Sequence, residues 1–286
     1  MKHLFGTFFI LIIVLQSVAQ VPTEKTLLWK ISNNISAKPS FLYGTVHIIC
    51  PDKMVIDTAI KQAFNTTTQL FLEIDLDDPQ MMVKAMKGMM MPDSISLEKM
   101  VGKTTYDSMN VIFKSKAGIG LNVMRKAKPM LLMSAIFPAL LQCTPDGYEK
   151  YFQAKAKENH MALKGLETIE YQMRIFDTIP YQVQADMLKN LLFNLDSTKK
   201  GFDEMLTVYL AKDINAMQQL TVKDKEFGKY DALMLKNRNN NWIPVIAKEM
   251  MSQPTFFAVG AAHLGGANGV INFLRQQGFK VEPIFY

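Results

Sequence analysis

Cysteine, histidine and tryptophan are scarce in this sequence, since its 286 residues contain two cysteines, four histidines and two tryptophans. Two cysteines are too few for a Cys-rich metal site. The sequence also lacks a Gly-x-Ser-x-Gly elbow, a His-Glu-x-x-His helix, a P-loop and a Gly-x-Gly-x-x-Gly fingerprint. Serine hydrolases with that elbow, zinc peptidases with that helix, P-loop nucleotide hydrolases and dinucleotide enzymes are therefore excluded.

Low-complexity runs are absent too. Hydrophobic residues make up 49% and charged residues 20% of the chain, which is ordinary for a globular protein. The length suits one large domain or two small ones. We therefore expect the chain to fold from about residue 22 onward.

A long apolar run occurs only near the start of the chain. Lys2 precedes apolar residues 4–15, and Ser17-Val18-Ala19 forms a small-x-small cleavage site. The pattern predicts a signal peptide over residues 1–19 and a mature chain, beginning at Gln20, that is periplasmic or secreted. An uncleaved anchor is the alternative, but a membrane span needs about 20 apolar residues. The mature form is expected to have no transmembrane anchor.

The two cysteines allow three interpretations. Export to an oxidising compartment favours a disulfide between Cys50 and Cys143. Two unrelated buried thiols are equally compatible with the sequence. In the third interpretation Cys50 is a metal ligand, because it lies three residues after His47.

Positive charge is in modest excess, with a net charge of +6 and a pI near 9.1. Many lysines alternate with acids, as in Lys223-Asp224-Lys225-Glu226. A solvated surface explains this pattern better than a nucleic-acid site does. No nucleic-acid partner is therefore expected.

Two parts of the chain show the order strand, turn, helix, strand. The first has strands at residues 29–32, 40–44 and 69–75 and a helix after Asp57; the second has strands at 255–260 and 280–285 and a helix at 268–277. Short β-α-β connections predict parallel pairs within each part. We expect an α/β fold, with one domain over residues 22–286 and a central mixed, largely parallel sheet.

A large helical insertion is predicted between these parts, over about residues 79–250. It begins with a methionine-rich segment that contains Met81, Met82, Met86, Met89, Met90 and Met91. Packing of an amphipathic helix on the core is the favoured interpretation. A mobile lid or an apolar binding surface is the alternative, because methionine adapts to irregular partners.

The same motif, Gly-x-x-His, follows one strand in each part, at Gly44 to His47 and at Gly260 to His263. Glycine allows a sharp turn off a strand, and ligands bind at the carboxyl edge of open α/β sheets. Histidine at that edge is suited to binding a metal or to acting as a general base. The matched pair favours a functional site over two structural histidines.

Three charged residues are further candidates. Glu73 lies in an apolar strand, where an unpaired carboxylate would be costly, so it needs a partner such as a metal or His47. Taken alone, Glu167 is explained as an acid at a helix start that interacts with the helix dipole. Arg238 could stabilise an oxyanion or orient a carboxylate, and by itself it would be a surface arginine.

Taken together, several segments resemble the TraB/GumN family, which includes the Tiki proteases. They are Phe41 to Ile48, Leu72-Glu73, Gly165 to Thr168, Arg238-Asn239 with Trp242, Val259 to Leu264 followed by Gly269, and Gly278 to Pro283. The resemblance implies an erythromycin-esterase/ChaN-like α/β fold with both Gly-x-x-His motifs at its centre. It also implies peptidase activity dependent on manganese or cobalt, as described for Tiki members.

Transferred by position, the resemblance implies a catalytic set of His47, Glu73, Glu167, Arg238 and His263. His47, Glu73 and His263 would hold a divalent metal, with manganese or cobalt ahead of zinc. We therefore expect a metal-dependent hydrolase, most plausibly a peptidase, acting on a peptide or small-molecule substrate. One alternative is a metal-free hydrolase that uses His47 as general base; the related erythromycin esterases also use a histidine without a metal. The other alternative is a non-catalytic envelope protein that binds a peptide or lipid.

Overall fold

The computed structural model describes residues 21–33, 38–224 and 228–286. The predicted signal peptide, residues 1–19, lies outside this range. Within the described ranges, no helix is both long and apolar enough to cross a membrane.

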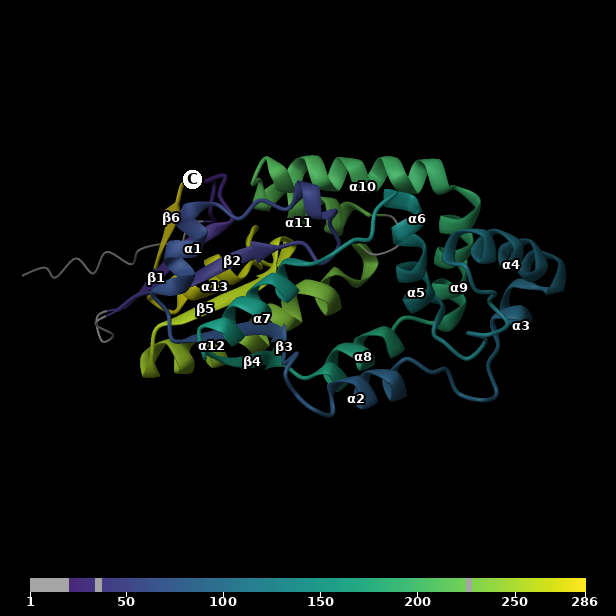
Figure 1. The fold of residues 1–286 in the computed structure, drawn as a ribbon, viewed down its shortest axis with the longest axis horizontal. Helices are drawn as coiled ribbons and strands as arrows, with labels where there is room; N and C mark the ends of the chain where they lie inside the picture. Colours follow the sequence, from purple (N-terminus) through teal and green to yellow (C-terminus); the bar gives the residue numbers. More distant parts are fainter. Residues whose placement is uncertain (1–20, 34–37, 225–227) are drawn as a thin grey trace, which may run out of the picture.

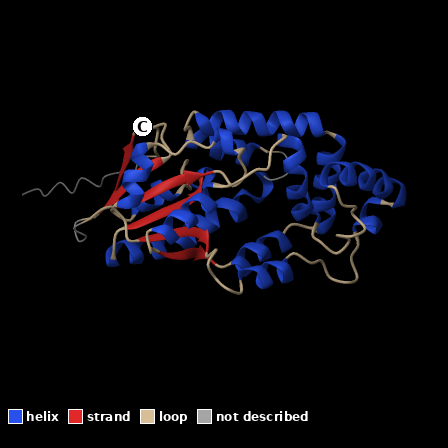
Figure 2. Ribbon diagram, viewed as in Figure 1, coloured by secondary structure: helices blue, strands red, loops and turns tan. Residues whose placement is uncertain are grey.

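Six strands of the described chain form one sheet in the order β4-β3-β5-β2-β1-β6. Figure 2 shows the strands gathered at one end of the molecule. They are β1 (Leu28–Ser32), β2 (Ser40–Thr45), β3 (Gln69–Ile74), β4 (Ala162–Glu167), β5 (Thr255–Gly260) and β6 (Lys280–Ile284). Strands β4, β3, β5 and β2 pair in parallel, whereas β1 is antiparallel to both β2 and β6. The predicted α/β class and the mixed, largely parallel sheet are confirmed.

The pairing within the two β-α-β parts differs from the prediction. Strand β5 lies between β2 and β3, and β6 pairs with β1 at the far edge of the sheet. In each part, the two strands that flank the helix, β2 and β3 or β5 and β6, point in the same direction but are not neighbours. This interleaving places β2 and β5, the two strands that carry Gly-x-x-His turns, side by side.

The predicted helical insertion is not entirely helical. Strand β4 lies within it and pairs in parallel with β3, from Gln69↔Ala162 to Ile74↔Glu167. Lys164 and Gly165 interrupt the apolar pattern of β4, and Ala162 and Lys164 are exposed, as an edge strand allows. The insertion therefore contributes to the sheet and carries Glu167 to its edge.

Helices surround the sheet and also form a separate helical end of the molecule (Figure 1). The α-helices are α1 (Thr58–Asn65), α2 (Met81–Gly88), α3 (Leu97–Val101), α4 (Lys103–Ala117), α5 (Pro129–Leu132), α6 (Phe137–Leu141), α7 (Tyr148–Glu158), α8 (Ile169–Asp177), α9 (Tyr181–Phe193), α10 (Leu195–Leu210), α11 (Ile214–Lys223), α12 (Asn237–Ser252) and α13 (Val270–Gln276). Short helical turns lie at Pro51–Lys53, Met133–Ile136, Gly228–Tyr230, Ala232–Lys236 and Ala261–His263. Figure 1 shows α3, α4, α5 and α9 gathered away from the sheet.

Aromatic rings pack helices α1 and α7 against the sheet. Asp57 caps α1, as predicted, by accepting a hydrogen bond from the Ala59 amide at 2.9 Å. Phe64 of α1 and Phe152 of α7 then pack on Phe256 of β5, with ring centroids 5.2 and 4.9 Å away. Burying such rings contributes about 1.5–3 kcal/mol each. The helices thus hold the strands whose ends form the candidate site.

The methionine-rich segment is mostly on the surface. Met82, Met86, Met89 and Met90 are exposed, whereas Met91 is buried. The buried residue of α2 is Ala85, which packs with α8. Packing on the core, the favoured interpretation, is therefore wrong for four of the six methionines.

Cys50 and Cys143 form a disulfide, with their Cα atoms 6.0 Å apart. The first of the three interpretations is confirmed, and Cys50 is not available as a thiolate ligand. Closing a loop across 93 positions of sequence stabilises the fold by about 4–5 kcal/mol in the chain-entropy model.

Candidate active site

The carboxyl ends of three adjacent parallel strands form the candidate site. Strands β2 and β5 pair in the register Gly44↔Val259 and Thr45↔Gly260, so the two Gly-x-x-His turns leave the sheet next to each other. Strand β3 pairs with β5 from its other side and carries Glu73. The topology therefore delivers two imidazoles and one carboxylate to one edge.

Glu73 lies at the centre of this arrangement. Its Oε1 accepts a hydrogen bond from the Gly260 amide at 2.9 Å. The same oxygen is 3.6 Å from His47 Nε2 and 3.8 Å from His263 Nε2. The structure thus brings together the three residues predicted to hold a metal.

Gly260 leaves room for these three side chains. A Cβ at this position would lie 3.3 Å from Glu73 Oε1 and 3.5 Å from His47 Nε2. It would also lie 3.5 Å from the His263 ring. The absence of a side chain at Gly260 therefore keeps open the space between the donors.

His263 is buried and neutral. Asn239 donates to the backbone oxygens of His263 and Asn268, which turns its own side-chain oxygen toward His263 Nδ1 at 2.6 Å. The Nδ1 atom therefore carries the proton, and Nε2 accepts from Arg238 Nη1 at 3.1 Å. Burial first, and then the Arg238 charge, lower the pKa of His263 to about 3. Trp242 stacks on the ring with a centroid distance of 4.5 Å.

His47 has a different environment. Its side chain is 57% exposed, and its Nδ1 lies 2.8 Å from Glu149 Oε1. Loss of water around the ring lowers its pKa, but the negative charges of Glu149 and Glu73 outweigh this and raise the pKa to about 9. His47 therefore carries a proton at neutral pH that it must release before it binds a metal or acts as a base.

Arg238 is the buried cation of the site. It lies in α12 and donates to both oxygens of Glu167 at 2.7 to 3.2 Å and to Glu73 Oε2. Burial raises the pKa of Glu73, but Arg238, His47 and His263 hold it well below its usual range. The surface-arginine alternative is wrong.

Glu167 ends β4 and points into the same cluster. Besides Arg238, it accepts a hydrogen bond from Trp242 Nε1 at 2.9 Å. Thr168, not Glu167, caps the following helix α8. The Glu167 carboxylate thus forms an ion pair with Arg238, a partner that the helix-start interpretation did not foresee.

Several polar residues of the site, Glu149 and Asn239 among them, were not selected from the sequence. Glu149 lies in the first turn of α7 and binds His47 and Thr45, and Asn239 orients His263. Asn239 is adjacent to Arg238 in a segment that already stood out. Glu149 has only a weak local signal, namely an acid just after Gly147 at a helix start.

The donor atoms suit a divalent ion, although they are not arranged around one. Both Nδ1 atoms are held by oxygen acceptors, as in most metal-binding histidines, which leaves both Nε2 atoms facing Glu73. Metal–ligand bonds of about 2.1 Å put neighbouring donors about 3.0–3.4 Å apart. The spacings of 3.6 and 3.8 Å are wider, and Arg238 engages the His263 lone pair.

In keeping with this spacing, no group of three or more His, Cys, Asp or Glu residues in the described chain is arranged to hold a metal ion. A shared ion would require both Nε2–Oε1 distances to shorten and Arg238 to release His263.

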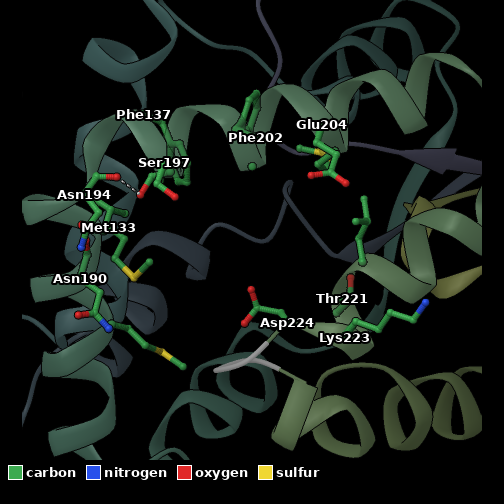
Figure 3. A pocket seen from close by; sticks show the side chains of 16 residues that line it. Met133, Phe137, Asn190, Asn194, Ser197, Phe202, Glu204, Thr221, Lys223 and Asp224 are labelled. Atoms are coloured by element: carbon green, nitrogen blue, oxygen red, sulfur yellow. Dashed lines mark hydrogen bonds between the residues drawn. The ribbon is translucent and has the colours of Figure 1, made fainter.

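A separate cavity of about 860 Å³ lies among α9, α10 and α11 (Figure 3). Its wall combines apolar side chains such as Phe137 and Phe202 with polar ones such as Asn190 and Asn194. The five candidate catalytic residues are not among the described residues that line it. The cavity and the histidine site are thus distinct features.

Comparison with known proteins supplies independent information. A sequence profile of the TraB/PrgY/gumN family matches residues 27–283. Metalloprotease TIKI2 of Danio rerio is 21% identical over 90% of this chain and 60% of its own length. Metalloprotease TIKI1 of the same fish is 22% identical over 90% of this chain and 63% of its own length.

A metalloprotease TIKI homolog of Nematostella vectensis is 20% identical over 86% of this chain and 65% of its own length. The chain thus spans about three fifths of the length of the curated relatives it matches. No solved structure matches it.

Proposed function

Because the chain belongs to the TraB/PrgY/gumN family, we propose that it is a metal-dependent hydrolase of the peptidase type, acting at the carboxyl edge of β2, β3 and β5. The observation that carries the proposal is the convergence of His47 Nε2 and His263 Nε2 on Glu73 Oε1, at 3.6 and 3.8 Å. The metalloprotease relatives support the reaction class.

In this proposal His47 Nε2, His263 Nε2 and Glu73 Oε1 would hold the ion. A bound divalent ion supplies an activated water and polarises the scissile carbonyl. Two imidazoles and one carboxylate suit several divalent ions, zinc included, and it is the family resemblance that favours manganese or cobalt.

The chain's own residues have distinct tasks. His263 is held by Asn239 and Trp242, so it offers its lone pair from a fixed position. The exposed His47 forms the open side, where a peptide or small-molecule substrate enters. Arg238 keeps Glu73 ionised and, once it releases His263, is placed to stabilise negative charge that develops on a substrate oxygen.

The disulfide is informative about the cellular compartment in which the protein works. A Cys50–Cys143 bond persists in oxidising compartments and is rare in reducing ones. It supports our proposal that the protein works in the periplasm or outside the cell.

A second candidate is a metal-free hydrolase in which His47 is the general base. The contact that favours it is the 3.1 Å hydrogen bond from Arg238 Nη1 to His263 Nε2, because it uses the lone pair that a metal needs. His47, with its exposed ring, would then deprotonate water alone.

Elemental analysis of the purified protein, followed by cleavage of a peptide library with and without chelator, tests both candidates. The metal-dependent proposal expects about one divalent ion per chain, and cleavage that chelator stops and added manganese or cobalt restores. Cleavage that chelator leaves unchanged would favour the second candidate. A His47→Ala protein that still cleaves peptides would contradict both.

A further inference from the structure

The segment from Cys143 to Glu149, which we call the strap, lies along the residues that follow the first Gly-x-x-His turn. It is fastened in three places. Cys143 bonds Cys50, the backbones of Asp146 and Ile49 exchange hydrogen bonds of 2.9 and 2.8 Å, and Glu149 binds the His47 ring. The strap therefore connects the disulfide to the site side chain.

The strap ends at a carboxylate that orients His47. Glu149 Oε1 is 2.8 Å from His47 Nδ1 and accepts from the Thr45 hydroxyl at 2.5 Å. A carboxylate can only accept, so Nδ1 must donate. In the neutral ring the lone pair is then on Nε2, the atom that faces Glu73.

Gly147 of the strap also packs closely against His47 and Glu149. A Cβ on Gly147 would lie 2.8 Å from both Glu149 Oε2 and the His47 backbone oxygen. The strap thus touches His47 at its backbone as well as at its ring. The Glu149 side chain is only 17% exposed, so little water competes for its hydrogen bonds.

We propose that Glu149 is the positioning residue of His47, and that the Cys50–Cys143 bond supports the site through Glu149. The bond holds the strap against the His47 turn, so opening it lets the carboxylate and the imidazole separate. The inference rests on His47 acting in the proposed function, and it applies with or without a metal.

Two kinds of variant separate this role from a general effect on folding. Glu149→Gln keeps the size of the side chain but allows either nitrogen of His47 to carry the proton. Cys50→Ser with Cys143→Ser opens the bond. Glu158→Gln is the matched control, because Glu158 lies in the same helix α7 and pairs with Lys155 on the surface.

The first readout needs no activity. Nitrogen-15 NMR of the neutral ring, recorded at alkaline pH, should show the Nδ1–H form of His47 in the wild type and a mixture of both forms in Glu149→Gln. An unchanged tautomer would overturn the positioning role. Because this measurement involves no metal or substrate, it remains decisive if the proposed function fails.

The second readout is affinity for manganese or cobalt, with kcat and KM measured separately. Removing a partner of a ligand histidine lowers metal affinity by about 10–100-fold. Glu149→Gln should show that loss, with kcat falling more than KM changes, while Glu158→Gln matches the wild type. Equal losses in both glutamate variants would contradict the proposal.

A double-mutant cycle tests the role of the disulfide. The double serine variant should lose about 3–10-fold in kcat/KM, and adding it to Glu149→Gln should change little further, because contacts in one network are not additive. The NMR tautomer reports on the serine variant independently of turnover, and a thermal melt shows whether it is folded. Full additivity, or a folded serine variant with wild-type tautomer and activity, would overturn the link between bond and site.

Discussion

The two Gly-x-x-His turns share a motif and a sheet edge but produce opposite histidines. His47 is 57% exposed and paired with a carboxylate, and its pKa is raised to about 9. His263 is 5% exposed and faces a guanidinium, and its pKa is lowered to about 3. At neutral pH one ring is charged and accessible, and the other is neutral and locked in place.

In the proposed function, this difference would give the two histidines separate tasks. Environments that push the pKa values of neighbouring groups apart commonly mark distinct acid, base or ligand roles. His263 would offer the lone pair of Nε2 from a fixed position once Arg238 releases it. His47, whose ring is exposed, would exchange its proton on the side where substrate enters in that proposal. The motif places a histidine at the edge, and the neighbours decide what it does.

Replacing each histidine by alanine is the strongest way to sharpen the comparison. Either change should lower kcat/KM by about 10³-fold or more, because both rings are needed. The free energy of unfolding should distinguish them. His263→Ala should cost about 1–3 kcal/mol, since it leaves buried polar partners unpaired, whereas His47→Ala removes an exposed ring and should cost less. Urea unfolding measures both, and equal costs would contradict the assigned environments.

Removing Arg238, the cation that lowers the pKa of His263, should have the next largest effect. Arg238→Met leaves Glu167 without its cation and Glu73 with His47 as its remaining cation, and should cost about 3–5 kcal/mol. It should also raise the pKa of His263, because the Arg238 charge no longer opposes protonation. Urea unfolding and NMR titration measure the two effects. Arg174→Met, at an exposed position of α8, is the control and should change neither.

The two motif glycines should respond differently to alanine. At Gly44 a Cβ would lie 3.1 Å from Ala261 Cα and from Leu264 Cδ2, so Gly44→Ala should cost about 1–3 kcal/mol of stability. At Gly260 the Cβ would instead meet site side chains at 3.3 to 3.5 Å. Gly260→Ala should therefore keep most of its stability and lose about 10–100-fold in kcat/KM. The reverse pattern in melts and kinetics would show that the roles are misassigned.

The smallest expected effect is the release of protons when a divalent metal binds. Between pH 6.5 and 8.5 His47 is protonated and His263 is not, so metal binding should displace one proton. Affinity for manganese or cobalt should then rise about tenfold per pH unit across this range. Calorimetry in buffers of different ionisation enthalpy counts the protons. Release of two protons would mean that both histidines have similar pKa values.

The strands of the sheet show where local pattern is sufficient. Strands β2, β3 and β5 were predicted within one or two residues because each is a short apolar run bounded by turn residues. Strand β4 was missed, since exposed Lys164 and flexible Gly165 break its pattern and its pairing partner β3 is distant in sequence. Edge strands need fewer apolar residues and therefore leave a weaker signal.

Some site residues could likewise be identified from the sequence, and others could not. His47 and His263 were identifiable because histidine is rare and the motif is repeated. Glu149 was not, because it is one of 26 acidic residues and its partner lies 102 positions away. Arg238 and Glu167 looked ordinary when taken alone, and only their mutual contact makes them buried partners.

The sequence by itself determined the strand-turn-helix units, the motif at the end of each and the family to which they belong, because these depend on local periodicity, glycine and residue type. Only the tertiary structure decided that β5 inserts between β2 and β3 and that Glu149 faces one histidine while Arg238 faces the other. Strand order and charge pairing depend on contacts between distant segments. The charge state of each imidazole follows from those contacts, because burial and neighbouring charges set its pKa.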